Sequence, residues 1–146
     1  MEIRLMQAED VSAIAELERI CFSDPWSEKS IASELDNRLA CWLVATVDGE
    51  VAGYVGSQTV LDGSDMMNIA VAPRHRRKGI AEALILALCE KLKARKSLCL
   101  LLEVRSSNTS AIALYEKLCF KPVGLRKNYY RNPREDALIL RKEWQI

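Results

Sequence analysis

The fold of this chain is decided by the stretch at residues 71–81, Val71-Ala72-Pro73-Arg74-His75-Arg76-Arg77-Lys78-Gly79-Ile80-Ala81. It follows a short apolar run, Met66–Val71, and precedes a segment in which leucines recur at helical spacing. A nearly continuous apolar run, Leu98–Val104, comes next and is typical of a strand covered on both faces. We therefore expect a right-handed strand–helix–strand crossover over Met66–Val104, with its two strands parallel.

An antiparallel half of the sheet is expected before this crossover. Cys41–Val47 and Val51–Val60 are apolar, β-rich runs separated by a turn that contains Asp48-Gly49, the strongest hairpin signal in the sequence. We expect a single α/β domain over residues 1–146, in which helices flank a mixed central sheet. Its remaining elements are expected to be strands at Ile3–Leu5, Lys121–Leu125 and Ala137–Arg141, and helices at Val11–Cys21, from Ser27 onward, and at Thr109–Leu118.

Bulk composition limits the classes of function. The formal net charge of +1 argues against nucleic acid as a direct partner. Met1–Leu5 lacks the basic start and apolar stretch of a signal peptide, and no apolar run approaches the roughly 20 residues of a membrane helix. Five widely spaced cysteines favour buried thiols in a reducing cytosol over disulfides or a metal site. His75, the single histidine, is expected at the surface. We expect a cytoplasmic protein with neither membrane association nor a bound metal.

The basic loop at residues 71–81 has the features of an anion-binding site. A helix N-terminus presents unpaired N–H groups and the positive end of the helix dipole. Gly79 and Ala81 keep side chains small there, while Arg76, Arg77 and Lys78 add positive charge. The loop is neither a Walker loop nor a GxGxxG motif. The alternative is a solvated basic turn, and a nucleic-acid patch is disfavoured because aromatic residues are not interleaved.

Arg76-x-x-Gly79-x-Ala81, after a strand ending in Asn68–Val71, resembles the acetyl-CoA signature of the GNAT acetyltransferase superfamily. In two positions the sequence departs from the family pattern: Ala81 replaces the commoner second glycine, and Cys119 stands where a glycine usually precedes the phenylalanine. Within the superfamily, the chain resembles the RimI-type family of ribosomal-protein alanine N-acetyltransferases through five further blocks, Pro25–Lys29, Leu102–Asn108, Ala111–Glu116, Asn128–Tyr130 and Glu135–Ala137.

The resemblance implies the GNAT fold, a mixed central sheet with a splayed parallel pair of strands and about four flanking helices. It also implies acetyl-CoA as co-substrate, with backbone amides of the basic loop on the pyrophosphate and the pantetheine arm between the splayed strands. The residues implied to bind this co-substrate are Ile69, Ala70, Val71, Arg76, Arg77, Lys78, Gly79, Ile80, Ala81, Asn108 and Tyr115.

Acetyl transfer to an amine requires a base, a stabilised carbonyl oxygen and a proton for the departing thiolate. A free α-amine has a pKa of about 7.7–8.0, whereas lysine has a pKa of about 10.4, so an N-terminal amine is more easily made neutral. Glu103 ends a buried strand at the edge where α/β sheets place their ligands, and it is the candidate base. The alternative is that Glu103 meets solvent or pairs with Arg105.

Tyr115 is the candidate acid. Its spacing from Ala111 and Leu118 puts it on the inward face of a helix, where a tyrosine is usually part of the core. The resemblance places the family's general-acid tyrosine at this position, where its hydroxyl would protonate the thiolate. Asn108 is expected to cap the same helix or to contact the cofactor arm, and the two roles are compatible.

Trp26, Tyr129 and Tyr130 are candidates for the walls of a peptide-sized cleft, because aromatic side chains combine contact area with a polar group. The alternatives are structural. Trp26 also fits a hydrophobic staple with Ile31 at the start of the helix from Ser27, and one of two adjacent tyrosines on a strand normally faces inward.

By resemblance, the substrate is the N-terminal alanine of small-subunit ribosomal protein eighteen, acetylated directly in a ternary complex. An acyl-enzyme is disfavoured because Ser106 and Ser107 have no base nearby in the sequence. Three alternatives remain open: a GNAT enzyme that acetylates lysine side chains or small-molecule amines, a non-catalytic module that senses acyl-CoA, and an RNA-binding protein that uses the basic loop.

Overall fold

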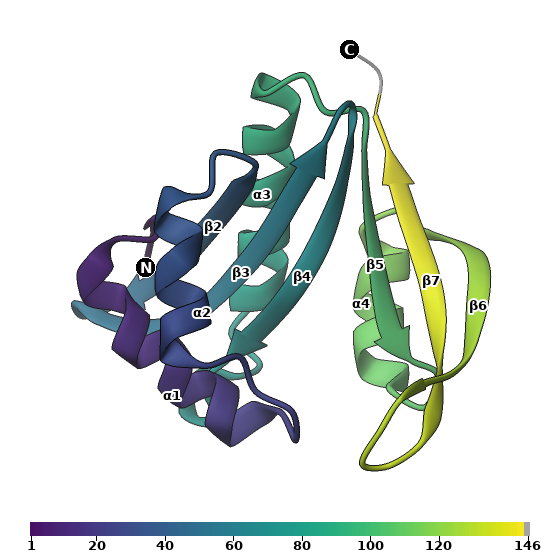
Figure 1. Cartoon of the computed structure of the whole chain (residues 1–146), viewed down its shortest axis with the longest axis horizontal. Helices are drawn as coiled ribbons and strands as arrows, with labels where there is room; N and C mark the ends of the chain where they lie inside the picture. The colour runs from purple at the N-terminus through teal and green to yellow at the C-terminus, as the bar shows by residue number, and fades with distance from the viewer. Residues whose placement is uncertain (145–146) are drawn as a thin grey trace.

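A computed structural model of the chain describes residues 1–144. One sheet of seven strands runs through the molecule in the order β1-β2-β3-β4-β5-β7-β6 (Figure 1). Every neighbouring pair is antiparallel except β4 and β5, which are parallel, as the crossover prediction requires. The strands are β1 (Glu2–Leu5), β2 (Ala40–Val47), β3 (Glu50–Val60), β4 (Gly63–Val71), β5 (Cys99–Arg105), β6 (Lys121–Tyr130) and β7 (Glu135–Glu143), and the α-helices of the described part are α1 (Val11–Cys21), α2 (Glu28–Ser33), α3 (Ile80–Ala94) and α4 (Thr109–Lys117).

The two parallel strands separate soon after they begin. They pair only where Gly63, Ser64 and Asp65 lie opposite Cys99, Leu100 and Leu101. Beyond Asp65 the strands diverge, and Figure 1 shows β4 and β5 opening into a V. A register shift against β3 lies at the same level and leaves Met67 without a partner there, and a bulge of this kind bends its strand. The sheet thus has a gap at the carboxyl ends of β4 and β5.

The two faces of the sheet carry different helices because side chains alternate along each strand. On β2, Leu43 belongs to a core cluster with Leu84 and Leu88 of α3, whereas Trp42 belongs to a second cluster with Ile14 of α1. Helices α1 and α2 therefore cover one face, while α3 and α4 cover the other (Figure 1).

The local turn and cap predictions are confirmed. Asp48 and Gly49, with φ values of 52° and 78°, make the left-handed turn that joins β2 to β3. The Ser27 hydroxyl accepts a hydrogen bond of 3.1 Å from the Ser30 amide and so caps α2. The residues that form this turn and this cap are neighbours in the sequence, so the sequence alone is enough to predict both.

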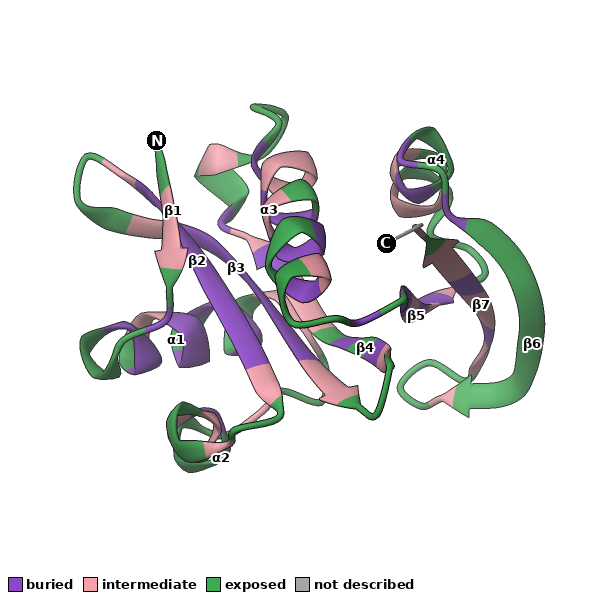
Figure 2. Cartoon of the chain, turned by 90° about the horizontal axis from the view of Figure 1, so that it is seen from above, coloured by how far each residue is buried: buried purple, intermediate pink, exposed green. Residues whose placement is uncertain are grey.

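Strand lengths at the C-terminal end differ from the prediction. Strand β6 extends to Tyr130 and β7 begins at Glu135, because a register shift between Arg126 and Tyr130 interrupts the alternation of side chains without ending the ladder. Figure 2 shows β6 exposed along nearly its whole length at the edge of the sheet. Strand β4 begins at Gly63, before the predicted Met66, since the turn is made by Leu61 with a φ of 58°.

The prediction of buried thiols is partly wrong. Cys41, Cys89 and Cys99 are buried, and burial raises the pKa of the Cys41 and Cys89 thiols. Cys21 is half-buried, and Cys119 is exposed because it follows α4 in the left-handed conformation that ends helices, with a φ of 73°. No helix within residues 1–144 has the length and apolarity needed to cross a membrane.

Candidate active site

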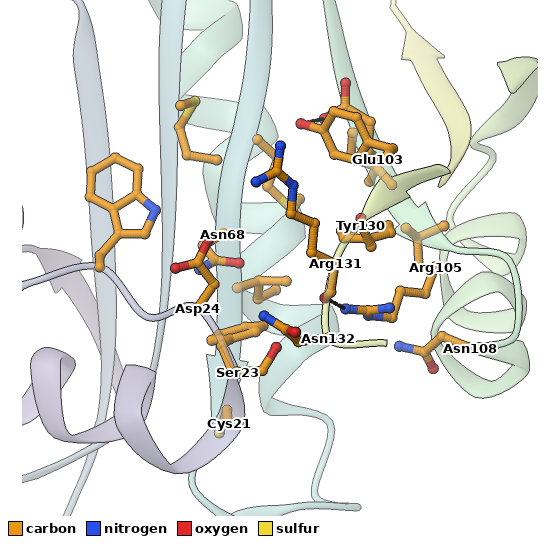
Figure 3. Close-up of a pocket in the computed structure, with 18 of the residues that line it drawn as sticks. Cys21, Ser23, Asp24, Asn68, Glu103, Arg105, Asn108, Tyr130, Arg131 and Asn132 are labelled. Atoms are coloured by element: carbon orange, nitrogen blue, oxygen red, sulfur yellow. Dashed lines mark hydrogen bonds between the residues drawn. The ribbon is translucent and has the colours of Figure 1, made fainter. Parts of the chain in front are cut away.

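Two cavities open where β4 and β5 separate. The larger, of about 850 Å³, lies beside Met66–Ile69 of β4 and Leu102–Arg105 of β5 and is shown in Figure 3. The smaller, of about 590 Å³, lies against the basic loop and the start of α3. Cys21, Phe22, Ile69, Asn108 and Tyr115 line both cavities, so the two volumes meet between α4 and the free edge of β4.

The smaller cavity has the donors that a phosphate group needs. Among the described residues, none of the amides from Arg77 to Glu82 donates a hydrogen bond to another backbone group. Arg77 and Gly79 are left-handed, with φ values of 64° and 77°, and this conformation turns the loop into the first turn of α3. A Cβ on Gly79 would meet nothing within 4 Å, so the glycine is required by its backbone angle and space remains beside it. The site fits an anion at a helix N-terminus.

The side chains of the basic loop do not all face this cavity. Arg76 and Arg77 line it, and Arg76 is held by hydrogen bonds from its Nε to the Val71 carbonyl (3.2 Å) and from its guanidinium to Cys21 Sγ (3.4 Å). Lys78 is exposed and is not among the lining residues. His75, expected at the surface, is half-buried and lines the cavity, and its Nδ1 is buried without a hydrogen-bond partner in the described chain.

Glu103 lies in the larger cavity, with its side chain 30% exposed. Its carboxylate accepts a hydrogen bond of 3.3 Å from Arg126 Nε and one of 3.4 Å from the Tyr129 hydroxyl. The alternative that Glu103 pairs with Arg105 is wrong, because Arg105 forms its ion pair with Glu135 instead. Glu103 is therefore a half-buried acceptor at the wall of the cavity.

Tyr115 projects from α4 and is only 7% exposed. Its ring packs edge-on against Phe120, with 5.6 Å between ring centroids. Its hydroxyl makes no hydrogen bond to the residues that the structure describes. Burial raises the pKa of Tyr115 to about 12, so its hydroxyl is protonated at neutral pH. Tyr115 thus presents a protonated phenol where the two cavities meet, which is what a general acid requires.

Asn108 does cap α4, since its Oδ1 accepts a hydrogen bond of 3.3 Å from the Ala111 amide. It also lines both cavities, so the capping role leaves it beside the space for a ligand. Within residues 1–144, no three His, Cys, Asp or Glu side chains gather in an arrangement that could hold a metal ion.

The three predicted aromatic residues all line the larger cavity. Trp26 packs edge-on against Trp42 at 5.4 Å between centroids, so it is anchored in the core while facing the cavity. Tyr129 is 49% exposed, and Tyr130 is half-buried beneath the Arg105 guanidinium, which lies 4.4 Å from its ring centroid. Burial, and then the charge of Glu103, raise the pKa of Tyr130 to about 12.

Sequence reasoning missed two loops that line the same cavity. The first is Phe22–Asp24, which follows α1 and precedes the predicted Trp26, and the second is Arg131–Pro133 between β6 and β7 (Figure 3). Arg105 holds the second loop through hydrogen bonds to the Arg131 and Pro133 carbonyls, of 3.0 and 2.8 Å. Arg105 stood in a block that resembles the family, but its partners lie at least 26 residues away, so spacing alone could not assign this contact.

Comparison with known proteins decides the family. Residues 11–120 match the Acetyltransferase (GNAT) family. The chain belongs to this family. A GNAT relative from Escherichia coli (strain K12), the ribosomal protein bS18-alanine N-acetyltransferase, is 39% identical over 140 residues, which cover 94% of each chain. The Salmonella typhimurium enzyme of the same name is 37% identical over the same share of both chains.

Solved structures agree with the GNAT assignment. The crystal structure of the ribosomal-protein-S18-alanine N-acetyltransferase from Escherichia coli matches with a TM-score of 0.91 at 37% identity, and covers 99% of this chain and 94% of that one. Ard1 from Thermoplasma volcanium matches with a TM-score of 0.90 at 23% identity, covering 99% and 98% of the two chains, and supports the fold alone. The chain is therefore a GNAT acetyltransferase with the family's mixed sheet, and acetyl-CoA is the family's acetyl donor.

Proposed function

We propose that this GNAT enzyme acetylates the N-terminal amine of a peptide, and that its natural substrate is the N-terminal alanine of ribosomal protein bS18. One observation carries the proposal: a carboxylate, Glu103, and a protonated phenol, Tyr115, line one cavity from different elements, next to the gap between β4 and β5. The names of the relatives supply the identity of the substrate.

The smaller cavity is the proposed site for the coenzyme. The unpaired amides between Arg77 and Glu82 would hold the pyrophosphate, with Arg76 and Arg77 adding positive charge. The pantetheine arm would lie in the gap past Asp65, where β4 has no partner on its β5 side. A main-chain amide on that free edge of β4 would then donate to the carbonyl oxygen of the acetyl group.

The proposed reaction is a direct transfer. Glu103 accepts a proton from the substrate's ammonium group, directly or through water, and the neutral amine then attacks the thioester carbonyl carbon to form the nitrogen–carbon bond. Tyr115 donates its hydroxyl proton to the sulfur as the carbon–sulfur bond breaks. Trp26, Tyr129 and Tyr130 form the walls against which the first residues of the peptide lie.

The test is mass spectrometry after incubation with acetyl-CoA and two matched peptides. One begins with alanine and carries the bS18 N-terminal sequence, and its twin has a blocked N-terminus and an internal lysine. Acetylation of the first peptide alone is expected, because the α-amine has the lower pKa. Product on the lysine twin would favour the lysine-directed alternative, and absence of product with every amine would favour the non-catalytic module. A cytoplasmic location, one single domain over residues 1–146 and the lack of a direct nucleic-acid partner stay predictions.

A further inference from the structure

Glu18 is a buried carboxylate that the proposed reaction does not use. It lies on α1 with 0% exposure and contacts Tyr54 of the core cluster that also contains Ile14. No Lys, Arg or His of the described chain forms an ion pair with it. Burial raises the pKa of Glu18, while hydrogen bonds from Trp26 and Asn68 oppose that rise. A carboxylate in such a place is costly unless its hydrogen bonds are satisfied.

Three donors from three separate elements meet at this carboxylate. The Trp26 amide, in the loop between α1 and α2, donates to Oε1 at 2.8 Å. Asn68 Nδ2, on β4 next to its bulge, donates to Oε2 at 2.6 Å, and the Tyr54 hydroxyl of β3 donates to the same oxygen. A carboxylate is an acceptor at every lone pair, so it takes all three donors at once, which neither an amide nor a hydroxyl does.

The two donors that matter for function line the larger cavity. Trp26 and Asn68 both line it, together with Ser23 and Asp24 of the same loop, and Figure 3 labels Asn68, Ser23 and Asp24 among the residues around the cavity. Glu18 itself lines neither cavity. One side chain behind the cavity wall therefore joins the α1–α2 loop to the free part of β4.

We propose that Glu18 is a positioning residue for the peptide substrate: it fixes the Ser23–Trp26 loop against β4 and so sets peptide affinity without touching peptide or coenzyme. The inference rests on the proposed function, because it takes the larger cavity as the peptide site. If the loop loses this attachment, the wall formed by Ser23, Asp24 and Trp26 is no longer held in place. The basic loop and α3, which line the smaller cavity, are not bonded to Glu18.

The kinetic test compares Glu18→Gln with a matched control, Asp10→Asn. Asp10 is also a buried carboxylate, 3% exposed, bonded to Arg4 and to the Gln7 amide, but it lines neither cavity. Glu18→Gln is expected to raise the KM for the alanine peptide about tenfold, with the KM for acetyl-CoA within about twofold, because one buried charged hydrogen bond is lost. Asp10→Asn should leave both constants near wild type. An unchanged peptide KM in Glu18→Gln, or an equal rise in the control, overturns the proposal.

A double variant tests whether the contact between Glu18 and Asn68, rather than the charge of Glu18, holds the loop in place. Asn68→Asp places a second carboxylate against Glu18, and adding Glu18→Gln restores a donor–acceptor pair with the roles exchanged. The double variant is expected to have a lower peptide KM than Asn68→Asp alone. If the double variant is no better, the contact does not position the loop.

Amide hydrogen exchange tests the inference without catalysis. Exchange of the Ser23, Asp24 and Trp26 amides should be about tenfold faster in Glu18→Gln than in wild type or Asp10→Asn, while α3 stays protected in all three. Unchanged exchange in this loop overturns the proposal even if wild type acetylates no peptide. Faster exchange with an inactive wild type would retain the anchoring of the loop but contradict the proposed function and with it the peptide role.

Discussion

The fold places Tyr115 and Glu103 in opposite environments, one apolar and buried and the other polar and partly exposed. Tyr115 is surrounded by apolar contacts, and burial alone raises its pKa. Glu103 is partly exposed and already accepts hydrogen bonds from Arg126 and Tyr129. One group is therefore kept neutral and the other is stabilised as an acceptor, which is the division that an acid and a base require.

Tyr115→Phe removes the proposed acid with little change in shape. We expect kcat to fall about 100-fold, the usual contribution of a general acid. The KM for acetyl-CoA should stay near wild type, because the ring contact with Phe120 is retained. Steady-state kinetics at neutral pH checks this, with Asp10→Asn, at a buried residue that lines neither cavity, as the control that keeps most of its activity. An unchanged kcat in Tyr115→Phe would show that Tyr115 is not the general acid.

The raised pKa of Glu18 makes the stability of the protein depend on pH. Its folded pKa lies above the ordinary value of 4.5, so its contribution to stability is fully present below pH 4.5 and is lost as the pH rises through the folded pKa. Glu18→Gln removes this titration. The free energy of unfolding of wild type, relative to Glu18→Gln, should therefore decrease as the pH rises from 4.5 to 8. Urea denaturation across that range measures it, and a constant difference would contradict the prediction.

Cys119 occupies a backbone conformation that suits glycine. Its φ of 73° places it in the left-handed region at the end of α4, and its side chain is exposed. Cys119→Gly is expected to raise the free energy of unfolding by about 1 kcal/mol, because the strain of a left-handed Cβ is relieved. Thermal or urea denaturation checks this, and Cys119→Ala, which keeps the Cβ, should show no such gain.

At the scale of elements, the basic loop and α3 form one unit. The amides from Arg77 to Glu82 donate to no backbone group of the described chain, and the left-handed Arg77 and Gly79 lie at the wall of the smaller cavity. The charges of Arg76 and Arg77 supplement these donors rather than replace them. The loop should therefore tolerate changes of side chain better than changes of backbone.

Reversal of charge in the loop tests this unit. The double variant Arg76→Glu, Arg77→Glu is expected to raise the KM for acetyl-CoA about tenfold or more, because two charge-assisted contacts to phosphate become repulsive. The peptide KM should change little, since neither residue lines the larger cavity. Lys78→Glu, at an exposed position outside the cavity, is the control. An unchanged KM for acetyl-CoA would contradict the placement of the pyrophosphate site at this loop.

Elements with local signals were predictable from the sequence. The β2–β3 hairpin, the cap of α2 and the crossover all follow from turn residues and periodicity, and Glu103 and Tyr115 could be placed on their elements. Glu18 could not be recognised, because its partners Tyr54 and Asn68 lie 36 and 50 residues away. The bounds of β6 and β7 also failed, since the left-handed Asn128 and the register shift near it leave no pattern in the sequence.

At the scale of the whole molecule, the sheet consists of two parts whose strands pair at three residue pairs, beside which the Leu98 amide donates to the Asp62 carbonyl at 2.7 Å. Figure 2 shows β5, β7 and β6 standing apart from β1–β4. The apolar cluster against α3 and α4 spans both parts and holds them together. A ligand in the gap would contact both sides at the level where the ladder is missing.

Coenzyme A should therefore stabilise the protein and slow amide exchange on both sides of the gap. A ligand at about 100 times its Kd adds about 2.7 kcal/mol to the free energy of unfolding. Protection is expected to rise most over Met66–Val71 and Leu102–Arg105, which have no ladder between them. Calorimetry and exchange mass spectrometry measure this, with β1 as the internal reference. No stabilisation by coenzyme A would contradict the proposed site.

If coenzyme binds in the gap, the short ladder between β4 and β5 makes the protein's resistance to proteases depend on that ligand. A protease acts on opened forms of a protein, and their population falls as a ligand of the closed form accumulates. If acetyl-CoA fills the gap between β4 and β5, a lack of acetyl-CoA will leave this gap open and will also stop the reaction. The resistance of this chain to proteolysis would then rise and fall with the concentration of acetyl-CoA.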